Sequence, residues 1–391
     1  MKISRSLIKK RMFVYMDNAS TTQTDPQVVR AINEYMVKNY SLPTSDYGHS
    51  FGLKSREALE KSREIVAKKI NASPSEIIFT SGAVESNNLA IKGVCLGSRG
   101  KNHAVTSKIE HGSVLKSFSS LEPRIKTTYV GVDKVGFVDL DEVDNAVTDK
   151  TSLVSIQHAN QEIGTIQDVK AVGEICGKNE CFFHMDASQS FTKVPIDVKK
   201  MNVDLISLSS QHIYGPKGVG ALYVRKGVKI RKLFDGGYEE FGIRPGIENI
   251  PGIIGFSKAV QIASASDAMH MKRLRDRLTR DLLKIKAVKL NGPLGDKRLC
   301  NNTNITFKYV EGESLLLHLD ARGIIVTTGS ACFSESLQPS YVITALGMSH
   351  EDAHGSIRFS LSKHNTMKEV EYVVNNTTEV VERLREISPL K

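Results

Sequence analysis

Residues 209–222 of the chain read SSQHIYGPKGVGAL. An apolar run at Leu205–Leu208 comes directly before this stretch, and a second run, Gly220–Val224, begins inside it. Short apolar runs bounded by turn residues are typical of buried strands, and the Gly-Pro pair at positions 215 and 216 marks a turn. The sequence therefore predicts a polar turn, with His212 in it, between two buried strands.

The same texture extends through most of the chain before residue 260. Segments with helical spacing alternate there with short apolar runs. The alternation predicts an α/β fold with a mainly parallel seven-stranded sheet and helices on both faces. The other expected strands are Ile77–Thr80, Ala104–Thr106, Thr128–Val130, Leu153–Ile156 and Phe182–Met185, and the clearest helical segments are Leu53–Lys69, Val84–Leu96 and Lys170–Lys178.

The texture changes in the last third of the chain. We expect a long charged helix from about Ala259 to Lys286, strands at Asn304–Phe307 and Ile357–Phe359, and a terminal helix from Thr366 to Ile387. These elements predict a smaller α/β C-terminal domain. The expected organisation is a basic N-terminal extension (1–11), a large domain (30–261) and a small domain built from 12–29 and 262–391.

The composition is that of a globular protein. The chain has 391 residues, of which 40% are hydrophobic, enough for one large domain and a smaller one. No apolar run approaches the ~20 residues that a membrane span needs, so no membrane partner is expected. No apolar core of signal-peptide length follows the first basic residues, which favours a cytoplasmic location.

Positive charge gathers at the start of the chain. The net charge is +10, and residues 1–11 hold five basic side chains and no acidic one. A solvated extension, or translation that begins at Met12, accounts for this pattern. An arm that binds nucleic acid is the alternative, but no aromatic residues interleave these charges as base stacking requires. Nucleic acid is therefore not an expected partner.

The cysteines do not form a recognisable metal motif. They are Cys95, Cys176, Cys181, Cys300 and Cys332, and no Cys-x-x-Cys pair occurs among them. No metal site is therefore expected, and the odd number fits free thiols in a reducing compartment. Cys332 stands apart, because the glycine, serines and threonines of Thr327–Ser334 suit a mobile functional loop. A buried core cysteine is the alternative.

Three candidate binding positions follow predicted strands. The small residues Gly82 and Ala83 precede a helix, where backbone N–H groups and the helix dipole favour an anion, although many such turns bind nothing. Asp186 follows a buried strand, where a carboxylate normally needs a charged partner; a helix N-cap is the alternative. His111 lies at another strand end, where a structural histidine is also common.

These motifs resemble those of the cysteine desulfurases, fold-type I enzymes of the class V aminotransferases that use pyridoxal phosphate (PLP). The resemblance extends from residues 17–22 (DNASTT) to the terminal helix, with the motifs in the order that the family has. It implies a homodimer that acts on L-cysteine and passes sulfur to an iron–sulfur scaffold or another acceptor protein.

The resemblance also implies roles for single residues. His111 would stack on the PLP ring and handle protons, Asp186 would pair with the ring nitrogen, and Gln189 would contact the ring hydroxyl. Cys332 would accept sulfur as a persulfide, and Arg358 would clamp the substrate carboxylate through a two-pronged hydrogen bond.

The chain departs from the family pattern mainly around the cofactor. Histidine replaces the Schiff-base lysine at position 212, and the histidine before it is Gln211. Val84 replaces a threonine whose hydroxyl binds the PLP phosphate. Ile247 replaces a threonine that reaches across the dimer interface to the partner's phosphate. The family's asparagine that helps to hold cofactor and substrate is Gln161.

These changes predict weak PLP retention. A lost hydrogen bond to a charged group typically costs ~1.5–3 kcal/mol, and an imidazole cannot form the imine that a lysine forms. The backbone at Gly82 and Ala83, together with Ser209, would still bind phosphate weakly. The chain resembles an archaeal branch that lacks this lysine, and we expect PLP to be weakly or noncovalently bound, or absent.

Three functions fit these observations. The favoured one is a sulfur-trafficking protein for iron–sulfur cluster assembly, in which Cys332 carries persulfide or ligates a cluster and PLP catalysis is impaired or absent. The alternative is an active cysteine desulfurase with noncovalent PLP. A purely structural partner subunit is the weakest, because the Cys332 loop retains the family pattern.

Overall fold

The computed structural model describes residues 12–45, 47–329 and 339–387. The chain forms two compact units. Among the described residues, the larger comprises those within 20–161 and 165–265, and the smaller comprises those within 12–19, Glu162–Gly164 and those within 266–387. Cys332 lies outside the described residues.

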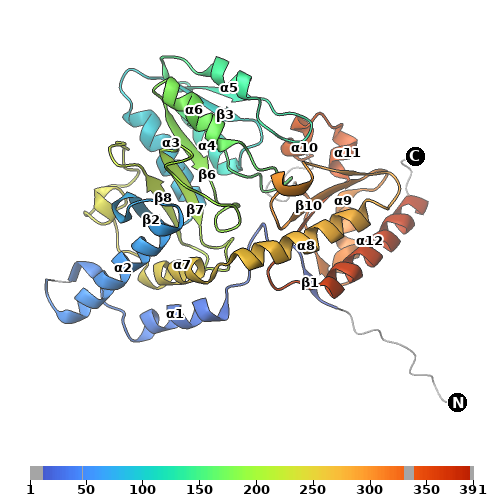
Figure 1. Ribbon diagram of the computed structural model, residues 1–391, viewed down its shortest axis with the longest axis horizontal. Helices are drawn as coiled ribbons and strands as arrows, with labels where there is room; N and C mark the ends of the chain where they lie inside the picture. The colour runs from blue at the N-terminus through green and yellow to red at the C-terminus, as the bar shows by residue number, and fades with distance from the viewer. Residues whose placement is uncertain (1–11, 46, 330–338, 388–391) are drawn as a thin grey trace. The chain divides into compact units, whose positions relative to one another are not determined.

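A seven-stranded sheet forms the centre of the larger unit, in the order β2-β8-β7-β6-β5-β3-β4 (Figure 1). Strand β8 is antiparallel to both of its neighbours, and the remaining pairs are parallel. The predicted α/β fold with a mainly parallel sheet is confirmed. The strands are β2 (Ile77–Thr80), β3 (His103–Ser107), β4 (Lys126–Val130), β5 (Thr151–Ser155), β6 (Phe182–Asp186), β7 (Leu205–Ser209) and β8 (Gly220–Val224).

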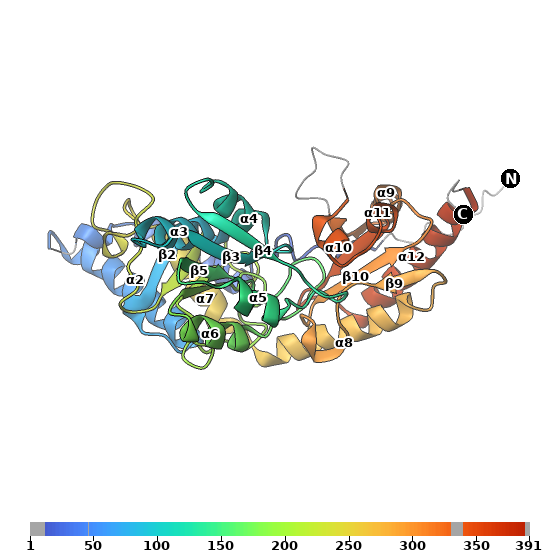
Figure 2. The same ribbon diagram turned by 90° about the horizontal axis from the view of Figure 1, so that it is seen from above.

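Helices cover both faces of this sheet because successive strand side chains point to opposite faces. In β3, Ala104 packs with one cluster of buried side chains and Val105 with another. Helices α3 and α4 supply the first cluster, and α1, α2, α6 and α7 supply the second (Figure 2). The bounds are α1 (Pro26–Val37), α2 (Ser50–Lys69), α3 (Ala83–Gly97), α4 (Gly112–Ser119), α5 (Leu140–Ala146), α6 (Val169–Lys178) and α7 (Ile250–Ile262).

The smaller unit contains an antiparallel sheet in the order β12-β10-β9 and a parallel pair of β1 and β11. Its core is apolar and is shared by these strands with α8, α9 and α12. The strands are β1 (Val14–Tyr15), β9 (Val288–Leu290), β10 (Asn302–Phe307), β11 (Ile324–Ile325) and β12 (Ser356–Ser360); the helices are α8 (Ala265–Leu282), α9 (Gly312–Asp320), α10 (Tyr341–Ala345), α11 (His350–His354) and α12 (Met367–Ile387).

The units differ from the expected domains in residues 20–29, 162–164 and 262–265, the last of which lie in the larger unit. The first segment lies in the larger unit, where the Thr22 N–H donates to the Gln211 carbonyl (3.0 Å) and the Asp25 N–H to that of Tyr214 (3.0 Å). Glu162–Gly164 lies in the smaller unit, where the Gly164 carbonyl accepts the Leu299 N–H (2.8 Å). These contacts join residues far apart in sequence.

The expected single helix from about Ala259 to Lys286 is wrong. Helix α7 ends at Ile262, and α8 spans Ala265–Leu282. Ala263 between them has an extended backbone (φ −67°, ψ 126°), which interrupts the helical hydrogen-bond ladder. Ser264 follows, and serine side chains compete for backbone hydrogen bonds at such breaks. Among the described residues, no helix is both long enough and apolar enough to cross a bilayer.

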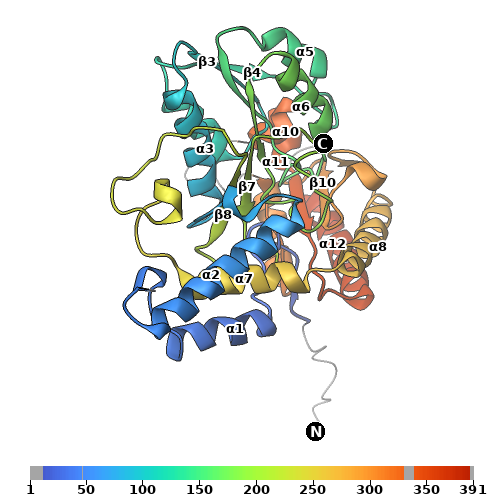
Figure 3. The ribbon, with the colours of Figure 1, turned by 60° about the vertical axis from the view of Figure 1, so that its left-hand side comes forward.

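A buried ion pair fixes the segment that follows β8. The Arg63 guanidinium, on α2, bonds both carboxylate oxygens of Glu240 at 2.8 Å, and the Phe79 N–H donates to the same carboxylate (2.6 Å). Glu240 and Phe241 have positive φ angles of 46° and 62°, which are strained for residues with side chains. The pair holds this strained turn against α2, which crosses beside α7 in Figure 3.

We expect Glu240→Ala to destabilise the protein by about 3–5 kcal/mol, because the substitution leaves a buried guanidinium without its carboxylate. Urea unfolding measures the loss. Glu60→Ala is the matched control, since Glu60 contacts the same guanidinium (3.3 Å) from an exposed position; it should cost less than about 1 kcal/mol. Equal effects of the two substitutions would contradict this assignment.

Candidate functional site

The turn after β7 holds the residues of the diagnostic stretch. The Gly215 N–H donates to the Ser210 carbonyl (3.1 Å), and a Cβ at Gly215 would overlap the Ser210 hydroxyl, so this position requires glycine. Tyr214 has a positive φ of 65°, and its N–H donates to the Thr22 hydroxyl (2.9 Å). The turn is therefore fixed by hydrogen bonds to Ser210 and to Thr22, which also fix the directions of its side chains.

His212 is buried in this turn, with 7% of its surface exposed. Its Nε2 lies 3.4 Å from the side-chain amide nitrogen of Gln189. The two residues that the sequence assigns to one cofactor ring are thus neighbours. The Gln211 side chain points elsewhere and donates to the Ser20 carbonyl (3.4 Å). Ser209 is buried at the end of β7.

One lysine lies close to His212. The Lys193 ammonium donates to the backbone carbonyl of Gln189 (2.9 Å) and to that of His212 (3.0 Å). These bonds direct the amine to the main chain of the turn. Lys217, which follows the Gly-Pro pair, is exposed. Neither amine therefore takes the side-chain position of residue 212.

Asp186 ends β6 and is 6% exposed. Its carboxylate accepts hydrogen bonds from the Asn87 amide (2.8 Å) and from the Ser188 N–H (2.9 Å) and hydroxyl (2.6 Å). All of these donors are neutral. A buried carboxylate with only neutral partners is suited to receive a cation. The alternative, a helix N-cap, is wrong, because no helix begins in the described stretch between Asp186 and β7 and the bond to Ser188 closes a turn.

Asn87 joins Asp186 to His111. The Asn87 amide also donates to the Ser113 hydroxyl (2.8 Å), which lies 2.8 Å from His111 Nδ1. The Ser113 N–H donates to the same ring nitrogen (3.2 Å), so Nδ1 is an acceptor and the neutral ring carries its proton on Nε2. His111 therefore caps α4 and at the same time belongs to the network around Asp186.

The sequence did not identify Asn87 or Ser113 as site residues. Asn87 lies on the buried face of α3 among Ala90, Ile91 and Val94. An asparagine on an otherwise apolar helix face needs hydrogen-bond partners, and this was the signal available. The identity of those partners depends on how α3 lies across β6, which the sequence does not state.

The predicted phosphate contacts Gly82, Ala83 and Val84 lie at the start of α3. Gly82 precedes the helix with φ 142° and no side-chain cap, and the space beside its α-carbon is open. Val84 is 58% exposed and can donate only its N–H. The Glu85 carboxylate accepts the Ser81 N–H (2.7 Å) and pairs with Arg244 (3.0 Å). The Gly82 N–H donates to the Thr80 hydroxyl (3.3 Å), a long hydrogen bond, and the space beside its α-carbon is open.

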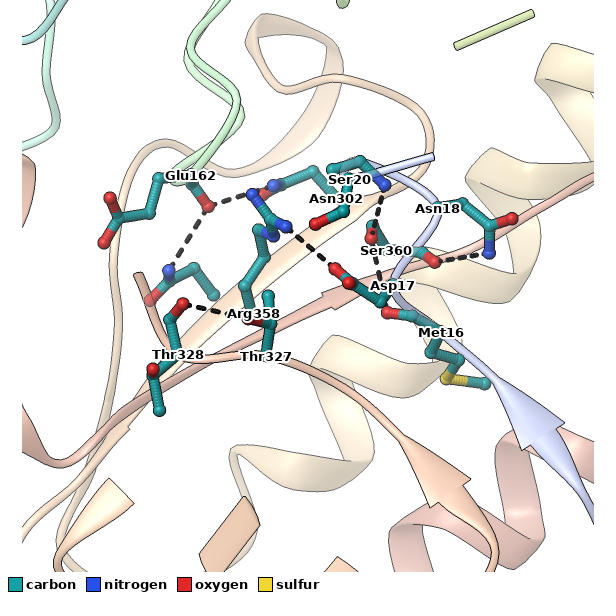
Figure 4. Close-up of polar contacts among 12 residues, drawn as sticks. Met16, Asp17, Asn18, Ser20, Glu162, Asn302, Thr327, Thr328, Arg358 and Ser360 are labelled. Atoms are coloured by element: carbon teal, nitrogen blue, oxygen red, sulfur yellow. Dashed lines mark hydrogen bonds and ion pairs between the residues drawn. The ribbon is translucent and has the colours of Figure 1, made fainter. Parts of the chain in front are cut away.

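Arg358 lies in the smaller unit, on β12, and ion-pairs with Asp17 (2.8 Å) (Figure 4). Its backbone pairs with Thr327, whose carbonyl accepts the Arg358 N–H (2.8 Å). Gln161, the predicted cofactor contact, ends a segment of the larger unit, and the next residue, Glu162, belongs to the smaller one. Neither Asp17 nor Glu162 was predicted as a site residue.

The residues of the larger unit fit the PLP ring but not its usual covalent attachment. Asp186 offers a buried carboxylate to a protonated ring nitrogen, and the start of α3 leaves open space beside Gly82 where a phosphate fits. At position 212 an imidazole replaces the amine. Within the described part of the chain, no cluster of three or more His, Cys, Asp or Glu side chains is arranged to hold a metal ion.

Glu110 is a second buried carboxyl beside this network. It accepts the Ser107 hydroxyl (2.6 Å) and the Gln157 N–H (2.9 Å). Burial raises the pKa of Glu110 to about 8; these two hydrogen bonds oppose the increase, and the charge of Asp186 adds to it. The carboxyl is therefore largely protonated at neutral pH, next in sequence to His111.

This raised pKa predicts a pH-dependent loss of stability. Between pH 4.5 and 8 the folded protein keeps the Glu110 proton that the unfolded chain has lost, so stability falls as the pH rises through this window. Glu110→Gln should remove that slope, worth a few kcal/mol at about 1.4 kcal/mol per pKa unit. Urea unfolding from pH 5 to 8 measures it. The exposed Glu122→Gln is the control, and an unchanged slope in Glu110→Gln would refute the assignment.

Comparisons with known proteins agree with this architecture. The aminotransferase class-V family pattern matches residues 14–373. The chain is 49% identical to the cysteine desulfurase IscS of Methanosarcina thermophila, over 96% of this chain and 94% of that protein. It is 44% identical to the cysteine desulfurase IscS 1 of Archaeoglobus fulgidus, over 96% of this chain and 99% of that protein.

Solved structures show the same fold. A NifS-like protein superposes with a TM-score of 0.89 at 38% identity, covering 95% of this chain and 100% of that chain. The matched family pattern, the identity to named desulfurases and the structural likeness extend over nearly the whole length. The chain therefore belongs to the cysteine desulfurase family of class V aminotransferases.

Proposed function

We propose that this protein is a sulfur carrier of the cysteine desulfurase family that supplies iron–sulfur cluster assembly. In the family reaction the Cβ–Sγ bond of L-cysteine breaks and the sulfur joins the Cys332 thiol, so that cysteine and thiol become alanine and persulfide. The persulfide sulfur then passes to an acceptor protein. Without its own turnover, the Cys332 thiol would accept sulfur from another persulfide, which leaves as a thiol.

The observation that carries the proposal is the side chain of residue 212. His212 lies beside Gln189, where the resemblance places the cofactor ring, and its imidazole cannot form the carbon–nitrogen bond that a lysine amine forms. Lys193 donates to main-chain carbonyls of the same turn. Catalysis would therefore be slow, and binding of PLP would be noncovalent.

Several residues would hold PLP when it is bound, and the group would supply an electron sink for the substrate carbon. Asp186 would bind the ring nitrogen, Gln189 the ring hydroxyl, and the backbone at Gly82 and Ala83 the phosphate. The His111 ring, whose Nδ1 accepts the Ser113 N–H, would present its Nε2 to the reacting groups. Arg358, oriented by Asp17, would bind the substrate carboxylate.

The second candidate is an active cysteine desulfurase that uses noncovalent PLP. The intact hydrogen-bond network of Asp186, Asn87 and Ser113 supports it, as do the relatives named cysteine desulfurase. A structure of SspA in complex with cysteine, 34% identical with a TM-score of 0.81, covers 90% of this chain and 100% of that chain. We therefore propose L-cysteine as the substrate of any turnover.

The proposed protein works as a homodimer with a sulfur acceptor. Tyr238 is 94% exposed, Ile247 66% and Phe234 53%, and all three lie on the long segment after β8. Apolar side chains so exposed in one segment are typical of an interface. The resemblance places residue 247, in this segment, at the dimer interface.

His212→Lys tests the anchor. The purified variant with added PLP should develop an absorbance band that borohydride reduces to a stable lysine adduct, whereas the wild type should not. Sulfide release from L-cysteine should rise at least tenfold in the variant. Lys193→Arg is the control, because arginine preserves the contacts to the two carbonyls and should leave the wild-type spectrum unchanged.

Each other outcome has a definite meaning. A borohydride-reducible band in the wild type would contradict the lost-anchor proposal, and sulfide release at ordinary enzymatic rates would favour the second candidate. If His212→Lys forms no adduct but the triple variant with Val84→Thr and Ile247→Thr does, the phosphate contacts are the larger defect.

Cys332→Ser tests the carrier role. Loading with a sulfur donor should place a persulfide on wild-type Cys332. Mass spectrometry would detect it as an increase of about 32 Da in the mass of the Cys332 peptide, the mass of one sulfur atom. The variant should transfer no sulfur to an iron–sulfur scaffold, while its oligomeric state stays unchanged. Cys300→Ser is the control. Normal transfer by Cys332→Ser would end the proposal.

A further inference from the structure

Glu162 contacts both described ends of the segment that carries Cys332. One end is Thr327–Gly329 and the other begins at Ser340, which caps α10. All of these residues belong to the smaller unit. None of the roles assigned above uses the Glu162 carboxyl, which is 3% exposed.

The first contact is steric. A Cβ at Gly329 would overlap the carboxyl group of Glu162, including Oε1 and Cδ. The main chain of Gly329 therefore packs directly against that carboxyl, and only glycine fits there. The backbone φ of Gly329 is not in the left-handed region, so the requirement comes from the carboxyl and not from the backbone conformation.

The second contact is a hydrogen bond. The Ser340 hydroxyl bonds the Glu162 carboxyl. The same hydroxyl oxygen accepts the Ile343 N–H (3.3 Å), and the Ser340 carbonyl accepts the Thr344 N–H (3.0 Å). Since Ser340 starts α10, the Glu162 carboxyl is connected to the first turn of that helix.

Glu162 is itself fixed to the sheet of the smaller unit. Its carbonyl accepts the side-chain amides of Asn302 (3.0 Å) and Asn304 (3.2 Å), both on β10 (Figure 4). Strand β10 pairs with β12, and Arg358 on β12 pairs with Thr327. The main chain of Glu162 is thus attached to β10, and β10 pairs with β12, the strand that carries Arg358.

We propose that Glu162 is a positioning residue that holds the two ends of the Cys332 segment in place, through contact with Gly329 and a hydrogen bond to Ser340. The inference rests on the proposed function only in taking Cys332 as the reacting thiol.

The hold depends on pH. Burial raises the pKa of Glu162 to about 7, while the Ser340 hydrogen bond and the positive charge of Arg358, which is paired with Asp17, oppose the increase. Ionised carboxylates accept stronger hydrogen bonds than protonated ones. The ends are therefore held more tightly at pH 8 than at pH 6.

Hydrogen exchange followed by mass spectrometry tests the inference without PLP or turnover. Glu162→Ala should speed exchange at least tenfold in peptides covering Thr327–Gly329 and Tyr341–Ala345 together. After correction for intrinsic rates, wild-type protection should rise about fivefold from pH 6 to 8, and Glu162→Gln should abolish this rise while keeping most of the protection. Glu379→Ala, an exposed partner of Arg322 in the same unit, is the control.

A second variant guards against misfolding of Glu162→Ala. Gly329→Ala keeps the charge but displaces the carboxyl, and it should speed exchange at both ends. A response at one end only, or a pH effect that persists in Glu162→Gln, would overturn the inference.

Alkylation of Cys332 by iodoacetamide, followed on its own peptide, links the ends to the thiol. Its rate should rise at least threefold in Glu162→Ala, with the rate at the partly exposed Cys300 unchanged; an unchanged Cys332 rate would contradict the link. If the exchange and alkylation results are as expected but Cys332 transfers no sulfur, the proposed function is wrong and the inference about Glu162 still holds.

Discussion

The buried carboxylate of Asp186 is the interaction on which the candidate site depends. It lies at the end of a central parallel strand and receives hydrogen bonds from Asn87 and Ser188, all from neutral groups. Removing such a charge from water is costly unless a cation or strong donors compensate. Asp186 stays buried with only neutral hydrogen-bond donors, so its desolvation is not compensated by a charged partner. The hydrogen bonds of Asn87 and Ser113 extend the network to His111. This network is the part of the larger unit that we propose binds the PLP ring.

The surroundings of residue 212 change what such a site can do. His212 is buried in a braced turn beside Gln189, so its imidazole occupies a defined position. The neighbouring Lys193 supports the main chain of this turn. A protein can therefore keep the ring-binding network and lack the covalent attachment, and this separation underlies the proposed role as a sulfur carrier.

In the smaller unit, Glu162 contacts both described ends of the segment that carries Cys332. Glu162 is tied to β10 by two asparagines, and its carboxyl meets both Gly329 and Ser340. Arg358 shares this support through its pairing with Thr327. The proposed substrate clamp and the ends of the Cys332 segment therefore depend on one small set of strands, while the proposed ring-binding residues belong to the larger unit.

The sequence by itself determined the strands of the large sheet, the family, and the residue types at Asp186, Gln189 and His212, because strand patterns and motifs are local in the chain. It did not determine the helix break at Ala263, which depends on one extended residue. Only the tertiary structure decided that Asn87 joins Asp186 to Ser113, and that Glu162 meets Gly329 and Ser340. These contacts join residues distant in sequence, and which distant groups meet is set by how the elements pack.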